Sequence, residues 1–371
     1  MSTTWLPCGK YHETYSQDHQ WWPTWFIRGK MLLLFLFVFV LVPVGAMYDR
    51  NVEYFATVLT MVGYTAMGAM GVQLLIGYAG LITLGHAAFI AIGAYISTLL
   101  VLQFPWPQFL LDWGLAYPLS IIAGAVGAGL WSVLFGLPSA RVKGFYLILT
   151  TMAAQFITVD FIITQYISQV GGRGQAFSVP PGAIKFGPWT IDTEIKVYLL
   201  MAVLALLMTV IMANLLRSRA GRAWVAIRDN DIAAETMGIN VIWHRLTAFF
   251  VAGAMGGVAG AFWVSNTAAI SPEHFPWSWS LWLVGVILIG GVGTIHGTFY
   301  GSLFMVVIVE ALQWAVIPLA DSYPKLLIDF AYLKEMAFGL AICAFLIFEP
   351  NGLAYRWWQL KNYFNLWPFS Y

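Results

Sequence analysis

Long apolar runs separated by short polar segments dominate the chain. The run from Tyr54 to Leu111 holds 58 residues without one Asp, Glu, Lys or Arg. As one helix it would be about 87 Å long, whereas the hydrocarbon core of a bilayer is about 30 Å thick. The run must therefore fold back and cross twice, and the segment 77–80 marks the turn because its glycines weaken a helix. The run from His274 to Val309 divides in the same way at residues 290–293.

This pattern predicts an all-α, polytopic integral membrane protein with about ten transmembrane helices. The expected spans are residues 31–48, 53–76, 80–102, 114–136, 144–166, 197–216, 246–266, 279–292, 297–317 and 332–348. They form a transmembrane domain over 31–348, with tails at 1–30 and 349–371. The first span is expected to be a retained helix and not a signal peptide, because a polar, Trp-rich segment precedes it and no small-residue cleavage site follows closely.

The composition supports a membrane protein and excludes several other classes. Hydrophobic residues make up 60% of the chain and charged residues 9%, whereas a soluble domain carries roughly 25% charged residues. Most of the surface is therefore expected to face the lipid bilayer. A net charge of +1 excludes a nucleic-acid partner bound by phosphate neutralisation. Two cysteines are too few for a disulfide framework or a zinc site.

The basic residues predict the orientation, because Lys and Arg concentrate in cytoplasmic loops. With the spans above, twelve lie on one side: Lys10, Arg28, Lys30, Arg141, Lys143, Arg217, Arg219, Arg222, Arg228, Arg245, Arg356 and Lys361. Six lie on the other side: Arg50, Arg173, Lys185, Lys196, Lys325 and Lys334. The first side is predicted to be cytoplasmic, and both termini lie on it.

The segment 217–245 differs from the other loops because it is long and rich in charge. Asp231 is expected to cap a short helix, and Gly238 to end it. Ile232, Ala233, Thr236 and Met237 would then share one face. Such a helix has two interpretations: it lies on the membrane surface, or it docks into a cytoplasmic partner.

Three segments, in this order along the chain, resemble the branched-chain amino acid permease family of ABC importers. They are GYAGLITLGHAAF at 77–89, continued by GAY at 93–95; AIRDNDIAAETMGIN at 226–240, followed by RLTAFF at 245–250; and SPEHF at 271–275 with GGVGTIHG at 290–297. The resemblance covers about residues 50–350. It implies a multi-pass permease subunit in the bacterial inner membrane.

By this resemblance, the short helix transmits ATPase motion to the permease. The residues expected to couple to the ATPase are Asp231, Ala233, Ala234, Glu235, Met237 and Gly238. The chain has no G-x-x-x-x-G-K-[ST] phosphate loop, so no cofactor is expected here and ATP is hydrolysed by partner subunits. The implied partners are ABC ATPase subunits, a second homologous permease and a periplasmic solute-binding protein.

The translocation path is expected beside the glycine-rich break, because unpaired backbone groups must face protein or water and not lipid. The candidate path residues are Gly77, Gly80, Thr83, Gly85, His86 and Glu310. His86 is either a structural hydrogen-bond partner or a substrate contact. Glu310 either contacts a solvated path or bonds to a neighbouring helix. Gln73, Gln155 and Asp160 are further polar candidates within the spans.

The chain has no catalytic motif and is therefore predicted not to be an enzyme. The expected solute is a branched-chain or other hydrophobic amino acid. The segment 150–156 lacks a glutamate that many family members carry, so urea, amides and aromatic or hydrophobic carboxylates remain alternatives. An ion-coupled secondary transporter is the rival class, although such proteins usually place ionisable pairs at the bilayer midplane.

Overall fold

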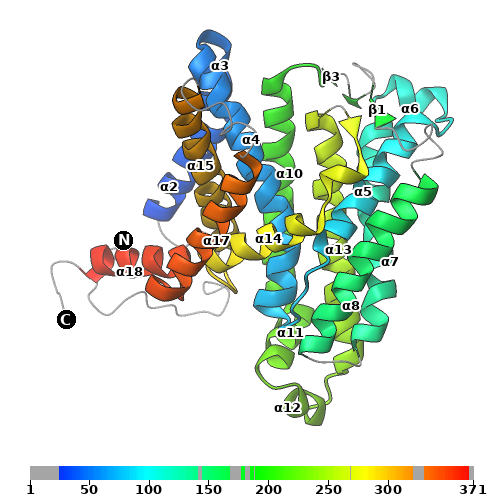
Figure 1. Cartoon of the computed structure of the whole chain (residues 1–371), viewed down its shortest axis with the longest axis vertical. Coiled ribbons are helices and arrows are strands. Elements are labelled where there is room, and N and C mark those ends of the chain that lie inside the picture. Colours follow the sequence, from blue (N-terminus) through cyan, green and yellow to red (C-terminus); the bar gives the residue numbers. More distant parts are fainter. Residues whose placement is uncertain are drawn as a thin grey trace.

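The computed structural model describes residues 25–140, 144–167, 177–179, 184–187, 189–267, 269–320 and 330–366. Helices make up most of these residues, as the sequence predicts (Figure 1). The first half contains α2 (Trp25–Leu36), η1 (Phe37–Leu41), α3 (Val42–Tyr48), α4 (Arg50–Val72), η2 (Gln73–Tyr78), α5 (His86–Leu102), α6 (Gln108–Asp112), α7 (Ala116–Ala140), α8 (Phe145–Gln155) and η3 (Phe156–Ile167). The second half contains α10 (Glu194–Arg217), α11 (Arg219–Asp229), α12 (Asp231–Thr236), α13 (Val241–Thr267), η4 (Pro272–His274), α14 (Trp277–Gly290), α15 (Ile295–Ala320), α17 (Phe330–Phe348) and α18 (Gly352–Leu366).

In the described parts of the connections, the structure has four two-residue strands. β1 (Phe177–Ser178) pairs antiparallel with β4 (Ala269–Ile270), so that Phe177 lies opposite Ile270. β2 (Lys185–Phe186) pairs in the same way with β3 (Trp189–Thr190). The first pair ties the connection after η3 to the end of α13.

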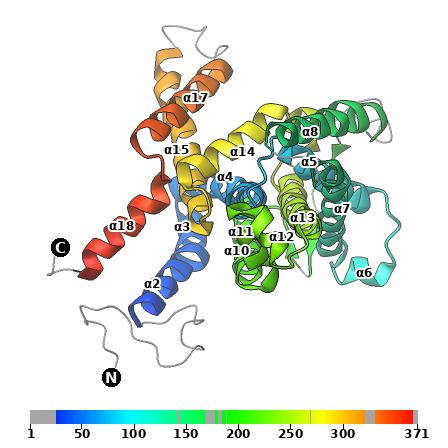
Figure 2. The same ribbon diagram turned by 90° about the horizontal axis from the view of Figure 1, so that it is seen from below.

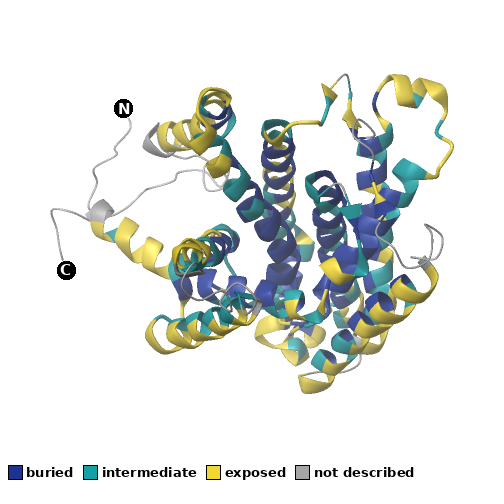
Figure 3. Cartoon of the chain, turned by 45° about the horizontal axis from the view of Figure 1, so that its top comes forward, coloured by how far each residue is buried: buried dark blue, intermediate teal, exposed yellow. Residues whose placement is uncertain are grey.

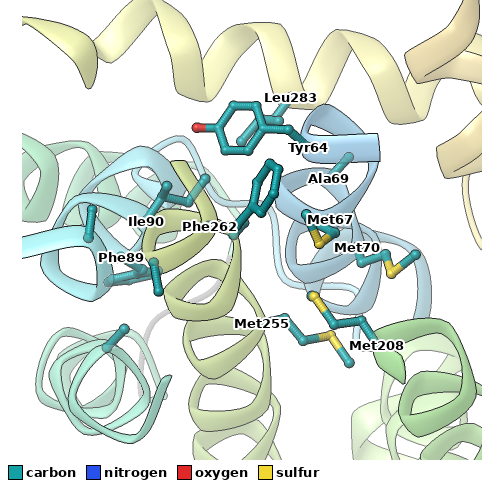
Figure 4. Packing of buried hydrophobic residues seen from close by; sticks show 14 of the residues in the cluster. Tyr64, Met67, Ala69, Met70, Phe89, Ile90, Met208, Met255, Phe262 and Leu283 are labelled. Atoms are coloured by element: carbon teal, nitrogen blue, oxygen red, sulfur yellow. The ribbon is translucent and has the colours of Figure 1, made fainter. Parts of the chain in front are cut away.

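The helices form two groups joined by α4 and α14 (Figure 2). One group contains α5, α7, α8, α10 and α13, with α11 and α12 at one end. The other contains α2, α15, α17 and α18. Buried residues concentrate on α4, α5 and α13, and exposed residues on α2, α6, α17 and α18 (Figure 3). The core therefore lies where α4 and α13 meet their neighbours, as the packing of Tyr64, Met67, Phe262 and Leu283 illustrates (Figure 4).

Glycines allow α5, α7 and α13 to approach closely. A Cβ atom at Gly257 would lie 2.7 Å from the Gly124 carbonyl oxygen, and one at Gly124 would lie 2.8 Å from the Gly93 carbonyl oxygen. Side chains larger than a hydrogen atom cannot fit at these positions. Each interior glycine weakens a helix by roughly 1 kcal/mol relative to alanine, and the closer contact between the three helices compensates for that cost.

Each of the ten predicted spans coincides with helical structure, but not all are long enough to cross a bilayer alone. Among the described residues, seven helices have the required length and apolar character, or up to eight if α17 and α18, which meet at 44°, form one span. α5, with 17 residues, and α14, with 14, are about 26 and 21 Å long. Ten is therefore an approximate number of crossings.

The third predicted span begins too early. Helix α5 starts at His86 and not at residue 80, because residues 79–85 are not helical. This segment is apolar and uncharged, so hydropathy alone does not distinguish it from a helix.

Replacing Gly257 with leucine tests the packing of α5, α7 and α13. Its side chain would clash with the backbone of α7, so we expect a loss of about 2 to 3 kcal/mol in the free energy of unfolding, measured by unfolding in mixed detergent micelles. Gly339→Leu is the matched control, because no described atom lies within 4 Å of a Cβ placed there. Equal stability of the two variants would contradict close packing at Gly257.

Candidate translocation and coupling site

The first helix break covers residues 77–85, that is, the last two residues of η2 and the non-helical segment before α5. Gly80 adopts φ +69°, in the left-handed region that favours glycine, and the Leu81 N–H donates to the Leu75 carbonyl (2.8 Å). Side chains from other helices bind the backbone beyond it: the Leu84 N–H donates to Thr151 Oγ1 (3.2 Å) and the Ala87 N–H to Ser280 Oγ (2.9 Å). These bonds satisfy backbone groups that lipid could not.

The predicted path residues of this segment differ in their exposure. Gly77, Thr83, Gly85 and His86 are buried, whereas Gly80 is exposed. The segment therefore faces protein at most of these positions within the single chain, and Gly80 lies where it leaves the core.

His86 begins α5 and is enclosed by glycines. Its ring lies edge-on to Phe89, with centroids 5.7 Å apart, and a Cβ at Gly256 would lie 3.1 Å from Nε2. Neither ring nitrogen has a hydrogen-bond partner among the residues that the structure describes. Within the described residues, His86 therefore does not form the structural hydrogen bond that was one of its two expected roles.

A second break, at residues 291–294, touches the first. Helix α14 ends at Gly290 because Gly291 adopts φ +118°, and a Cβ at Gly77 would lie 2.7 Å from the Gly293 backbone nitrogen. Gln73 Nε2 donates to the carbonyls of Gly291 (3.1 Å) and Thr294 (2.8 Å). Gln73 therefore joins η2 to the second break.

Gln155 and Asp160, the other polar candidates, lie in different surroundings. Gln155 is buried, and its Nε2 donates to the Phe275 carbonyl (3.0 Å). Asp160 is exposed on η3. Gln155 therefore joins two parts of the core, whereas Asp160 lies outside the core.

The charged loop folds into α11 and α12. Asn230 caps α12 by accepting a hydrogen bond from the Ala233 N–H (3.1 Å), so the expectation that Asp231 is the cap is wrong. Gly238 ends the helix as expected: it adopts φ +85°, its N–H donates to Glu235, and the Ile239 N–H donates to Ala234.

Asp231 instead forms an ion pair. Its carboxylate lies 3.0 Å from the guanidinium of Arg245, whose side chain is 9% exposed. The pair attaches α12 to the first turns of α13, which gives Asp231 a structural reason to be acidic.

The remaining residues proposed for coupling differ in exposure along α12. Ala234 is buried against the protein, whereas Ala233, Glu235, Met237 and Gly238 are exposed. Ile232 is 69% exposed and Met237 84%. α12 lies at the end of the molecule (Figure 1), and Ile232 together with the C-cap residue Met237 exposes two large apolar side chains there.

Arg228, which is not among the coupling or path residues expected from the sequence, connects this loop to the first break. Its Nη1 donates to the Gly77 carbonyl (2.6 Å), and its Cα would lie 3.2 Å from a Cβ at Gly80. The only sequence signal was its place in the segment 226–240. A cavity of about 300 Å³ adjoins it, lined by residues that include Gly80, Leu147, Asp231 and Arg245.

Glu310 lies apart from these residues. Tyr54 Oη donates to Glu310 Oε2 (2.5 Å), so the structure shows the bond to a neighbouring helix. Tyr54 and Gly71, which adjoins His86, both belong to α4. Their 17-residue separation corresponds to about 26 Å along the helix. The structure does not bring Glu310 to the break.

The Asp231–Arg245 pair predicts how the attachment of α12 responds to mutation. Asp231→Ala leaves the buried guanidinium without this carboxylate, so we expect a loss of about 2 kcal/mol in the free energy of unfolding, the size expected for a hydrogen bond to a charged group. Asp231→Ala combined with Arg245→Met should recover part of that loss, measured by the same unfolding assay. An additive effect of the two substitutions would contradict the coupling of the pair.

Comparison with known proteins gives a consistent result. Residues 54–346 match the family described as "Branched-chain amino acid transport system / permease component". The chain is 26% identical to the high-affinity branched-chain amino acid transport system permease protein LivM of Escherichia coli (strain K12), over 88% of this chain and 75% of that protein.

Two further relatives cover more of their own length. One is a probable LivM of Methanocaldococcus jannaschii, 24% identical over 82% of this chain and 94% of the relative. The other is LivH of Escherichia coli (strain K12), 23% identical over 78% of this chain and 91% of the relative. No solved structure matches. Together with the apolar helices and their glycine breaks, the match over most of the chain shows that this protein belongs to the branched-chain amino acid permease family of ABC importers.

Proposed function

We propose that this chain forms part of the translocation path for a small solute in an ABC importer of the bacterial inner membrane. The proposed solute is a branched-chain or other hydrophobic amino acid, in keeping with the names of the relatives. ATPase subunits, a second homologous permease and a periplasmic binding protein complete the importer, and both termini of this chain lie in the cytoplasm.

The contact between Arg228 and the first break is the observation that carries this proposal. A guanidinium from the charged loop donates to the Gly77 carbonyl at 2.6 Å, and such charge-assisted hydrogen bonds are strong. The loop that would receive the ATPase is therefore bonded directly to the segment proposed for the path. A displacement of the loop would therefore be transmitted to that segment through this hydrogen bond, without involving the other helices.

Helix α12 has the form of a docking element. It projects beyond the ends of the neighbouring helices (Figure 1) and exposes Ile232 and Met237. A helix lying in the membrane surface would instead present its apolar side chains toward the lipid. Contact with an ATPase subunit would remove both side chains from water.

Two attachments would carry motion from α12 into the permease. The Asp231–Arg245 pair joins it to α13, and α11 brings Arg228 to η2. Both breaks meet at Gly77 and Gly293. Short non-helical segments between helices change direction at lower cost than helix interiors, so movement is expected there.

An ion-coupled transporter would need a different arrangement of ionisable residues. It would require ionisable groups paired near the midplane, and Glu310 is bonded to Tyr54. Uptake that follows the proton gradient and ignores vanadate would favour that alternative. Uptake that requires ATP and stops with vanadate supports an ABC importer.

Reversing the charge of Glu235 tests docking at α12. Glu235→Arg changes an exposed side chain, so folding should be unaffected while ATPase association and ATP-driven uptake fall at least tenfold. Lys185→Glu, a charge reversal in the exposed strand β2, is the matched control. Full uptake and full ATPase association in Glu235→Arg would rule out docking at this helix.

Neutralising Arg228 separates docking from coupling. Arg228→Gln removes a charge-assisted hydrogen bond worth about 1.5 kcal/mol or more, which corresponds to roughly a tenfold loss of ATP-driven uptake. ATPase association should persist, because α12 is unchanged. ATP-driven uptake and ATPase association are both measured on the assembled importer. Arg219→Gln, which removes another exposed guanidinium of the same helix but leaves the Arg228–Gly77 bond in place, should behave as the wild type. Normal uptake in Arg228→Gln would show that the Arg228–Gly77 hydrogen bond does not transmit motion from the loop to the first break.

A further inference from the structure

Helix α18 lies across the direction of α10, a helix long and apolar enough to cross a membrane. It runs sideways in the lower half of the view that also contains α11 and α12 (Figure 1), and it is seen lengthwise where α10 is seen end-on (Figure 2). It follows α17 after a bend of 44°. Arg356, Gln359, Lys361 and Asn362 of α18 would be costly in hydrocarbon. These features suit a helix at the membrane surface, on the side of the charged loop.

One face of α18 carries apolar side chains bordered by basic ones. Leu353, Trp357 and Leu360 recur at the spacing i, i+4 and i+7, which aligns them along one side of a helix. Trp357 is 44% exposed and Leu360 52%. Arg356 and Lys361 border this stripe on its two sides, where their long side chains can cover apolar surface and still reach lipid headgroups. Such a face is typical of a helix that lies in a membrane surface.

The start of α2 adjoins this face. Lys30 Nζ lies 4.6 Å from the centroid of the Trp357 ring, which is a cation–π contact. Trp357 is held from another side by Tyr300 of α15, with ring centroids 6.2 Å apart. Lys30 is exposed, and an ammonium group has three N–H donors. The junction of α2 and α18 can therefore offer donors of Lys30 to a further acceptor.

Positive charge dominates both helices. Together α2 and α18 carry Arg28, Lys30, Arg356 and Lys361, and neither helix contains Asp or Glu. Glu349, which precedes α18, pairs with Arg356. Among the described residues, the ammonium groups of Lys30 and Lys361 form no ion pair. The charge of the junction is therefore complementary to an anion.

The first turn of α18 touches the second helix break. Gly352 adopts φ +75°, and a Cβ placed there would lie 2.6 Å from the backbone nitrogen of Gly291. A Cβ at Gly291 would lie 3.1 Å from the Cβ of Ala354. The Gly291 carbonyl in turn accepts a hydrogen bond from Gln73. Because backbone packs on backbone here, a displacement of α18 would be felt by the segment 291–294.

We propose that α18 lies in the cytoplasmic membrane surface and that the junction of α2 and α18 binds an anionic phospholipid, which holds α18 against the second break. The phosphate accepts hydrogen bonds from the ammonium groups of Lys30 and Lys361. The acyl chains cover the apolar side chains of Trp357 and Leu360. A zwitterionic phospholipid fits less well, because its cationic headgroup is repelled by the same ammonium groups.

The apolar part of the face favours a lipid over a soluble anion. A soluble phosphate would neutralise the lysines but leave Leu360 in water. The surface also continues into α17, whose Leu340 and Ile347 are 62% and 74% exposed and suit contact with acyl chains. The lipid site itself does not depend on the identity of the solute, whereas its effect on uptake rests on the proposed transport function.

Binding of phosphatidylglycerol to the full chain tests the site. The chain is reconstituted in nanodiscs of equal parts phosphatidylcholine and phosphatidylglycerol, and the lipids that stay bound are counted by native mass spectrometry. We expect the chain to retain phosphatidylglycerol in preference to phosphatidylcholine. Lys30→Gln and Lys361→Gln should each lower the association constant of phosphatidylglycerol about fivefold. Arg219→Gln, which removes an exposed basic group of α11, is the matched control and should bind as the wild type.

Spin labels test the position of α18, with Cys8 and Cys343 replaced. A label at Leu360 should collide mainly with oxygen, which concentrates in lipid. A label at Tyr355, on the other side of the helix, should collide mainly with a water-soluble nickel complex. Protection of the Leu360 label from both reagents only when ATPase subunits are added would identify a protein as the occupant of this face and overturn the proposal.

ATP-driven uptake by the assembled importer tests the link to the second break. Uptake should rise several-fold when phosphatidylglycerol is added to phosphatidylcholine vesicles, and the combined variant Lys30→Gln with Lys361→Gln should lose this rise. The proposal is overturned if the wild type shows no preference for phosphatidylglycerol, if both lysine variants bind it within twofold of the wild type, or if uptake is independent of it. Uptake that ignores the lipid rejects this inference alone, whereas lipid binding without ATP-driven uptake in any mixture rejects the transport function.

Discussion

The structure depends on one constraint: backbone polar groups cannot remain unpaired in the hydrocarbon of a bilayer. Helices satisfy this requirement by themselves, but the segments 79–85 and 291–294 are not helical. Side chains from four other elements compensate. Thr151 accepts from Leu84 in the first break, and Ser280 accepts from Ala87 in the first turn of α5. Gln73 donates to the second break, and Arg228 donates to the carbonyl of Gly77. These bonds therefore hold η2, α8, α14 and α11 together.

Close approach of backbone to backbone explains where several of the glycines lie. Gly93, Gly124 and Gly257 bring α5, α7 and α13 to backbone contact, which packs a rigid core around the first break. Gly77 and Gly293 allow the two breaks to touch. The protein thus combines closely packed helices with two adjoining points where helices are interrupted, and Arg228 reaches these points from the charged loop. This arrangement suits a permease in which a displacement outside the membrane alters the segment between two helices.

Local features were predictable from the sequence, and long-range contacts were not. Charge-free runs located the helices, and Gly238 marked the end of α12 because only a left-handed residue forms that cap. Asn230 and Asp231 both carry capping side chains and are adjacent, so the sequence could not distinguish them; the pairing of Asp231 with Arg245 depends on how α12 packs on α13. The bonds from Arg228 to Gly77 and from Tyr54 to Glu310 join residues 151 and 256 positions apart. No local pattern indicates such contacts.

The central claim is that the charged loop and the first break move as one unit. Electron paramagnetic resonance distances between spin labels test it in the assembled importer, with Cys8 and Cys343 replaced. Labels at Met237 and Ile82, which are both exposed, report on the unit, and labels at Ile82 and Phe161 report on its movement relative to η3. Between the resting and the vanadate-trapped states, we expect an unchanged first distance and a changed second distance. A change in the first distance with none in the second would contradict it.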